Sequence, residues 1–173
     1  MVFEPNDNDS SNAGTGGLTV RIYLDASALN RPFDDQRLSR NRLEAAAVLA
    51  ILEWIETGKI ALISSAALVY ENMMSPLIDR RDYVTTYLAL ATSFVAADPA
   101  LLRRATEFEA QGMRPLDALH LASAEGGRAG SFVTCDDRIL KGARRGKLGA
   151  RLANGTPIEF VATRTRKTPN GQS

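Results

Sequence analysis

The chain is predicted to adopt a three-layer α/β/α fold with a mainly parallel, Rossmann-like sheet. Short apolar, β-rich runs (TVRIYL, IALI, SFVT and PIEFV) alternate with longer segments that carry helix starts, helix stops or apolar stripes. Strands that alternate with helices are typical of a parallel sheet covered on both faces. The 173 residues are enough for one domain with a sizeable core, and the sequence has no internal repeat and no interior linker.

Both ends of the chain are expected to lie outside this domain. Residues 1–17 include a stretch rich in Asn, Asp, Ser and Gly (NDNDSSNAGTGG), a composition that cannot bury a core and that predicts a disordered leader. Residues 163–173 (TRTRKTPNGQS) are similarly polar and predict a flexible tail. The folded domain is therefore expected over residues 18–162.

The first predicted strand, Thr19–Leu24, alternates in polarity and ends at Asp25. The segment Asn30–Gln36 (NRPFDDQ) contains a proline and several turn formers, which indicates a loop. A long helix is predicted over Leu38–Thr57, and Gly58 ends it. The apolar stripe of that helix is expected to comprise Leu43, Ala47, Ala50 or Ile51, and Trp54.

The rest of the chain continues the alternation of strands and helices. Capping residues, prolines and glycines mark the boundaries, as at Asp98 and Pro99. The expected elements, in order, are a strand at Ile60–Ile63, a helix from Ser64 or Ser65 through Met74, a helix at Asp79–Leu90, a short strand at Ser93–Ala96, a helix from Asp98 to Gln111, a helix from Pro115 that stops at Gly126 and Gly127, a strand at Ser131–Thr134, a helix at Asp136–Arg145 and a last strand at Pro157–Val161.

Composition narrows the class of protein. A net charge of +1 excludes the strongly basic signature of a protein that coats nucleic acid, but not an enzyme that grips a few phosphates. Cys135 and His120 are the one cysteine and the one histidine, so an internal disulfide and a zinc site of Cys and His ligands are both excluded within one chain. No apolar stretch is long enough to span a bilayer, and the N-terminus lacks the features of a signal peptide. A cytoplasmic protein is expected.

Two acidic residues closely follow predicted strands. Asp25 comes directly after the first strand, and Asp136 lies within two residues of the SFVT strand. Because ligands of open parallel sheets bind beyond the carboxyl ends of the strands, both acids are expected at the same edge. Asp117, in the first turn of a helix, and Glu71, on the helix after the IALI strand, could converge on them.

A cluster of these four carboxylates predicts a site for a hard divalent cation. Carboxylates in a partly buried pocket repel one another, and desolvation disfavours their charged forms. Mg²⁺ or Mn²⁺ would neutralise them, because these ions prefer carboxylate and water oxygens. A cation so held can bind a phosphate oxygen and activate a water, so the predicted chemistry is phosphodiester hydrolysis.

Each acid also has a structural interpretation. Asp25 could start a turn, Asp117 could stabilise a helix N-terminus through the helix dipole, and Asp136 could cap the next helix. Glu71 could be a solvated helix residue. The order and local settings of the four acids, rather than any single one, favour a common site.

Four segments in this order resemble the motifs of the PIN-domain nucleases, a family that includes the toxins of bacterial toxin–antitoxin pairs. YLDASAL is similar to the first motif, ISSAALVYENM to the second, PLDALHLASA to the third and SFVTCDDRIL to the fourth. The resemblance implies a metal-dependent endoribonuclease that uses Mg²⁺ or Mn²⁺ and acts on RNA, with an antitoxin and a second copy of the chain as partners. The catalytic and metal-binding acids that it implies are Asp25, Glu71, Asp117 and Asp136, with Ser27 and Thr134 as neighbouring hydroxyls.

The loop NRPFDDQ departs from the usual toxin motif, so a PIN-like nuclease outside toxin–antitoxin pairs is the alternative. The loop adds Asp34 and Asp35 near the expected site, and Glu44 lies on the following helix. These three acids are interpreted as solvated, with outer-shell or substrate contacts as the alternative. Arg31 and Arg138 are candidates for contacts with substrate phosphate, although Arg138 belongs to a basic run that could equally be a solvated helix face.

Other residues and other functions remain open. His120, three residues after Asp117, is interpreted as packed or hydrogen-bonded, with orientation of a ligand or binding of substrate as the alternative. Cys135 is expected to be a small buried residue rather than a nucleophile. The alternative functions are an RNA-binding or regulatory PIN-like module with a weak metal site, and a phosphoryl-transfer enzyme with Asp25 as nucleophile. A resemblance of the second to the haloacid-dehalogenase-like pattern would imply an aspartate at the position of Ser27.

Overall fold

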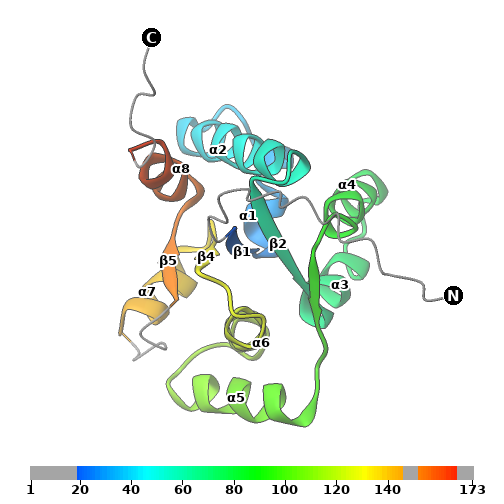
Figure 1. Ribbon diagram of the computed structural model, residues 1–173, viewed down its shortest axis with the longest axis vertical. Helices are drawn as coiled ribbons and strands as arrows, with labels where there is room; N and C mark the ends of the chain where they lie inside the picture. Colours follow the sequence, from blue (N-terminus) through cyan, green and yellow to red (C-terminus); the bar gives the residue numbers. More distant parts are fainter. Residues whose placement is uncertain (1–18, 146–151, 167–173) are drawn as a thin grey trace, which may run out of the picture.

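Five parallel strands form the centre of the computed structural model, which describes residues 19–145 and 152–166 (Figure 1). The strands lie in the order β3-β2-β1-β4-β5, and every neighbouring pair is parallel. Their bounds are β1 Val20–Leu24, β2 Ile60–Ser65, β3 Ser93–Val95, β4 Ser131–Val133 and β5 Ala153–Gly155. Because β1 is central, the residue that follows it lies in the middle of the carboxyl edge of the sheet.

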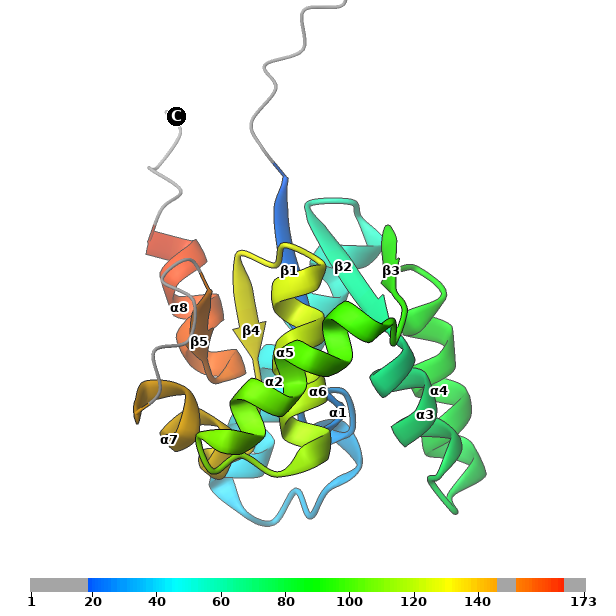
Figure 2. The ribbon, with the colours of Figure 1, turned by 90° about the horizontal axis from the view of Figure 1, so that it is seen from below.

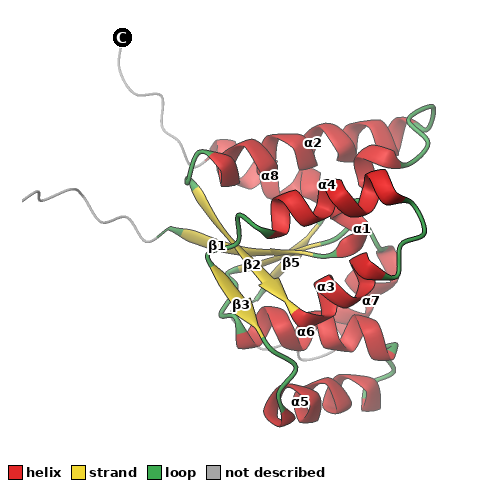
Figure 3. Ribbon diagram, turned by 90° about the vertical axis from the view of Figure 1, so that its right-hand side faces the viewer, coloured by secondary structure: helices red, strands yellow, loops and turns green. Residues whose placement is uncertain are grey.

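Helices cover both faces of the sheet (Figure 3). On one face α2 packs with α8, and on the other α6 contacts β2 and β4 while α5 packs over α6. The helices are α1 Ala26–Leu29, α2 Ser39–Glu56, α3 Ala66–Met73, α4 Ile78–Leu88, α5 Pro99–Ala110, α6 Pro115–Gly126, α7 Asp137–Arg145 and α8 Pro157–Arg166, with a 3₁₀ turn, η1, at Arg31–Phe33. The predicted three-layer α/β/α fold with a parallel sheet is confirmed.

The two central strands are buried on both faces, as expected for a sheet between two helical layers. Ile22, Tyr23 and Leu24 of β1 are completely buried, and every residue of β2 is buried. Both strands are therefore held in position by the core, and the helices that follow them start at fixed points. Figure 2 shows α1, α3 and α7 gathered at the same edge, beyond the ends of the strands.

The predicted last strand is wrong, because residues 157–161 begin α8 and the fifth strand, β5, precedes them. The helix starts with Pro157, where the missing N–H leaves no intrahelical hydrogen bond unmade. Thr156 and Glu159 form a reciprocal cap: the Thr156 N–H donates to Glu159 Oε2 over 2.8 Å, and the Glu159 N–H donates to Thr156 Oγ1 over 3.2 Å. Phe160 packs into the core from this helix. The residues Thr156 to Glu159 (TPIE) form a capping pattern that predicts the start of a helix in the sequence.

The predicted stripe of α2 is also wrong in part. Ala47 and Ile51 are buried as expected, but Leu43 is 59% exposed and the buried face includes Glu44. Glu44 was interpreted from the sequence as a solvated residue. Here Glu44 is 1% exposed and pairs with arginines, so the buried face lies one residue further along the helix than expected.

The expected leader, residues 1–17, lies outside the described residues, as do residues 167–173 of the expected tail. Residues 163–166, which were assigned to the tail, are the last residues of α8. None of the helices in the described part of the chain is long and apolar enough to cross a bilayer.

Candidate active site

Asp25 lies at the carboxyl end of the central strand, where the chain turns into α1. It caps that short helix, because Ala28 donates its backbone N–H to Asp25 Oδ1 over 3.0 Å. Ser27 Oγ donates to the same oxygen over 2.8 Å, and Thr134 Oγ1 donates to Oδ2 over 2.7 Å. The carboxylate is buried with three donors from two strand ends, which fixes both of its oxygens.

The same two hydroxyls hold the segment that follows β4. The N–H of Cys135 donates to Ser27 Oγ over 2.9 Å, and the N–H of Asp136 donates to Thr134 Oγ1 over 2.9 Å. Because β1 and β4 are neighbours in the sheet, these bonds tie Asp136 to the position of Asp25. The two acids predicted to share an edge of the sheet do so.

Burial raises the pKa of Asp25, because a desolvated site disfavours the charged carboxylate. The hydrogen bond from Thr134, the charge of His120 and the bonds from Ala28 and Ser27 oppose this rise without cancelling it. The surroundings of Asp25 therefore do not fully offset the cost of burying its charged carboxylate.

Glu71 reaches the pocket from α3 and is held by a chain of buried hydrogen bonds. Glu71 Oε2 lies 2.7 Å from His120 Nε2, His120 Nδ1 lies 2.8 Å from the Tyr23 hydroxyl, and that hydroxyl lies 2.7 Å from Ser65 Oγ. A carboxylate only accepts, so His120 Nε2 carries the proton in its bond to Glu71. Burial raises the pKa of Tyr23, which keeps its hydroxyl protonated and able to donate a hydrogen bond within this chain of bonds.

The buried His120 is hydrogen-bonded, as interpreted from the sequence, and its bond to Glu71 orients a candidate site acid. The two interpretations offered for this histidine are therefore compatible. Glu71 itself is half-buried rather than a freely solvated helix residue.

Asp117 and Asp136 form a second pair of acids, on α6 and after β4. Partial burial raises the pKa of Asp117, and the negative charge of Asp136 raises it further. Asp136 behaves oppositely, because Arg138 holds its pKa below the usual range. Arg138 Nη2 lies 2.7 Å from Asp136 Oδ2, and Arg138 Nε lies 3.2 Å from Oδ1. The two acids are close enough to repel each other.

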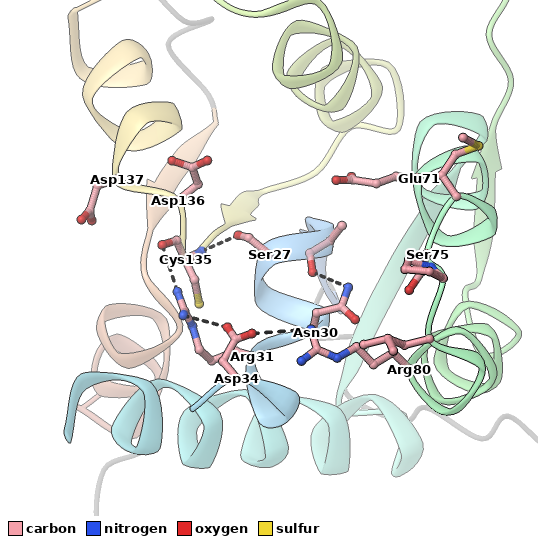
Figure 4. Close-up of a pocket in the computed structure, with 14 residues that line it drawn as sticks. Ser27, Asn30, Arg31, Asp34, Glu71, Ser75, Arg80, Cys135, Asp136 and Asp137 are labelled. Carbon is pink, nitrogen blue, oxygen red and sulfur yellow. Dashed lines mark hydrogen bonds and ion pairs between the residues drawn. The ribbon is translucent and has the colours of Figure 1, made fainter. Parts of the chain in front are cut away.

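A pocket of about 770 Å³ opens beside these acids (Figure 4). Ser27, Glu71 and Asp136 line it, together with Arg31 and Arg80. Figure 4 shows Glu71 pointing from α3 into the space in front of Ser27, with Asp136 on the opposite side. Asp25 is buried behind Ser27, so it borders the site from within the fold.

Arg31 belongs to an ion-pair network that the sequence did not reveal. Its Nε lies 2.9 Å from Glu44 Oε2, its Nη1 donates to Asp34 over 2.9 Å, and its Nη2 donates to the Cys135 carbonyl over 3.2 Å. Arg40 binds Glu44 Oε1 over 2.9 Å. The interpretation of Glu44 as solvated is wrong, because this carboxylate is buried between two guanidinium groups.

The network continues to α7, where Arg40 makes two 2.7 Å hydrogen bonds to the carboxylate of Asp137. Asp35, by contrast, is exposed and pairs with Arg37. The loop at Asn30–Gln36 thus packs against the segment that carries Asp136.

The expectation for Cys135 is borne out: it is 5% exposed, and burial raises the pKa of its thiol to about 12.

The donor set suits a hydrated Mg²⁺ or Mn²⁺ better than a fully enclosed ion. Within residues 19–145 and 152–166, no three His, Cys, Asp or Glu side chains stand close enough together to hold one metal ion. Mg²⁺ usually keeps several waters and takes one or two carboxylates directly, so a complete protein cage is not required. The raised pKa of Asp25 and of Asp117 indicates carboxyl groups that an added cation would stabilise in the charged form.

Comparison with known proteins identifies the family. The family model described as PIN domain matches residues 22–145, which is most of the chain. The chain belongs to the PIN-domain family. PIN domains are generally nucleases, so this chain has the fold of that class of hydrolases.

A search of the curated proteins finds no match to this PIN domain. Fourteen chains of solved structures match it. One of them is the crystal structure of PAE2754 from Pyrobaculum aerophilum, with 18% sequence identity and a TM-score of 0.45. That comparison covers 87% of this chain and 98% of the other.

Proposed function

We propose that this PIN-domain protein is an endoribonuclease that hydrolyses RNA phosphodiester bonds with the help of Mg²⁺ or Mn²⁺. The observation that carries the proposal is the buried carboxylate of Asp25, held by the hydroxyls of Ser27 and Thr134 beside Asp136. A turn or helix cap needs one side-chain acceptor, and it does not account for two further hydroxyl donors on a carboxyl group whose charge burial disfavours.

Four acidic residues would contribute to the proposed metal site. Asp25 and Asp136 would hold the ion, with Asp117 and Glu71 completing its surroundings through bound water. The bound ion supplies positive charge for a phosphate oxygen and lowers the pKa of a water. Glu71, oriented by His120, offers a carboxylate oxygen to a water in the pocket.

The test is cleavage of a panel of single-stranded RNAs in EDTA, Mg²⁺ and Mn²⁺. Asp25→Asn removes a proposed ligand, and Asp82→Asn, an exposed residue of α4, is the matched control. We expect metal-dependent cleavage by the wild type and by Asp82→Asn, and none by Asp25→Asn. Cleavage that survives in Asp25→Asn, or that is as strong in EDTA, would overturn the proposal.

An RNA-binding module without strong catalysis is the second candidate. It is favoured by the internal pairing of two site acids, Asp136 with Arg138 and Glu71 with His120, which competes with metal binding. Calorimetric titration with Mn²⁺ separates the two candidates. The nuclease requires millimolar or tighter binding that Asp25→Asn weakens, whereas the module predicts RNA binding with no measurable heat from the metal.

A phosphoryl-transfer enzyme with Asp25 as nucleophile is disfavoured by the local sequence. Ser27 stands where a second aspartate would be required.

A toxin role, with an antitoxin partner and a homodimer in the cytoplasm, remains a proposal that rests on the family. Exposed apolar residues at the end of α3 and the start of α4, among them Met73, Met74 and Ile78, offer a surface that a partner chain could cover. Expression of the wild type should then arrest growth while Asp25→Asn does not. Light scattering measures the oligomeric state independently of that outcome.

A further inference from the structure

Two arginines line the pocket, and the protein uses them differently. Arg31 donates to Asp34, to Asn41 and to the Cys135 carbonyl, and it pairs with Glu44. A guanidinium has five N–H groups, and these partners occupy most of them. Arg31 therefore stabilises the wall of the pocket, and its charge is neutralised within the protein.

The hydrogen bond that holds Arg80 at the pocket has a neutral acceptor. Its Nη2 donates to the backbone carbonyl of Phe33 over 2.7 Å, and its guanidinium lies 5.6 Å from the centre of the Phe33 ring. That ring is fixed in turn by an edge-on contact with Tyr83, with ring centres 4.9 Å apart. Among the described residues, the acidic group in ion-pair range is Asp34, at 3.7 Å from Nη1, which is too long for a hydrogen bond.

Arg80 thus combines a fixed orientation with unused hydrogen-bonding capacity. Its side chain is 29% exposed, and Figure 4 shows it reaching from α4 toward the Asn30 side of the pocket. Because Phe33 already orders the Arg80 side chain, this side chain loses little conformational entropy when a ligand binds to it. An arginine fork suits a phosphate, which accepts two parallel N–H bonds.

We propose that Arg80 binds a backbone phosphate of single-stranded RNA that flanks the position of cleavage. The pocket is then an RNA subsite lined by the acids Glu71 and Asp136 and by Arg80, with Asp34 beside the guanidinium. Its volume of about 770 Å³ lies inside the range of roughly 300–1,000 Å³ that is usual for ligand sites. This inference rests on the proposed function for the identity of the ligand, although the binding step can be measured without cleavage.

The experiment measures RNA binding in the Asp25→Asn background, which keeps the strand intact. Fluorescence anisotropy with a labelled single-stranded RNA is recorded over a range of salt concentrations for Arg80→Ala, Arg80→Lys and Arg81→Ala. Arg81 is the matched control: it is the next residue of α4, carries the same charge and borders a different hollow, with Asn72 and Thr85. Thermal unfolding of each variant reports on folding.

We expect Arg80→Ala to weaken binding about 10-fold, as for the loss of one charge-assisted hydrogen-bonded contact. The slope of log K against log salt should fall in magnitude by about 0.7, the value for one phosphate of a single strand. Arg80→Lys should recover part of the affinity, because it keeps the charge but lacks the fork. Arg81→Ala should change binding by less than about 2-fold, because salt screens a charge outside the pocket.

Equal losses in Arg80→Ala and Arg81→Ala, or no RNA binding in the background protein, would overturn the subsite. The cleavage assay distinguishes this failure from that of the proposed function. If the wild type cleaves RNA and the two alanine variants bind RNA alike, the proposed nuclease activity is retained and the Arg80 subsite is rejected. If the wild type does not cleave RNA and Arg80→Ala alone loses affinity, RNA binding by Arg80 is retained and the proposed nuclease activity is rejected.

Discussion

Replacement of Glu44 by glutamine removes the one negative charge that joins Arg31 to Arg40. The carboxylate is 1% exposed, and each of its oxygens lies 2.9 Å from a guanidinium nitrogen. The variant keeps the size of the side chain, so it tests charge rather than packing. Because Arg31 also holds the carbonyl of Cys135, the change should loosen the segment that leads to Asp136.

The expected loss of stability follows from the exposure of the partners. Removal of one member of a buried ion pair costs about 3–5 kcal/mol. Arg40 is 51% exposed and can be solvated, and Arg31 keeps Asp34 as a partner, so we expect about 2–3 kcal/mol here. For chains of roughly 150–250 residues each kcal/mol shifts Tm by about 2–4 °C, so Tm should fall by about 4–12 °C.

Thermal unfolding followed by circular dichroism measures the shift, with Glu53→Gln as the control. Glu53 is an exposed residue of the same helix, and its substitution makes the same change in charge. A Tm drop in Glu44→Gln no larger than that in Glu53→Gln would refute the reasoning. A double-mutant cycle with Arg40→Ala should give a coupling of about 0.3–0.5 kcal/mol, since that pair is i,i+4 and half exposed.

Two further predictions concern the site itself. Asp117→Asn should abolish cleavage and leave the metal-free protein equally or more stable. Because the pKa of Asp117 is raised in the folded state, its charge costs stability above that pKa; the advantage of the variant should be present at neutral pH and vanish below about pH 4. Urea unfolding in EDTA across pH measures it, and a destabilised variant at pH 7 would contradict it. Cys135→Ala should retain cleavage, because burial raises the thiol pKa to about 12; lost cleavage at unchanged Tm would implicate the thiol.

Most of the fold could be predicted because its signals are local. Apolar runs and helix boundaries are set by residues within one or two turns of each other, and the predicted elements up to Arg145 all exist with small shifts at their ends. The failure at residues 157–161 has the same local character: the apolar run PIEFV predicted a strand, whereas the cap formed by Thr156 and Glu159 starts a helix.

The candidate site could be predicted only as a set of acids. The positions of Asp25 and Asp136 at strand ends require no more than a parallel sheet, and both lie at its carboxyl edge. The hydrogen-bond and ion-pair partners of these acids could not be identified from the sequence. Arg80 carries no motif, and it reaches the pocket because Phe33, 47 residues away, holds its guanidinium.

The sequence by itself determined the alternation of strands and helices, the family motifs and the edge of the sheet at which the acids gather. Tertiary structure decided which charges neutralise one another. Arg31 meets the Cys135 carbonyl across 104 residues, and Arg40 meets Asp137 across 97. Secondary structure follows from neighbours three or four residues apart, whereas a buried charge such as Glu44 is stable only where packing brings its partners within hydrogen-bond distance.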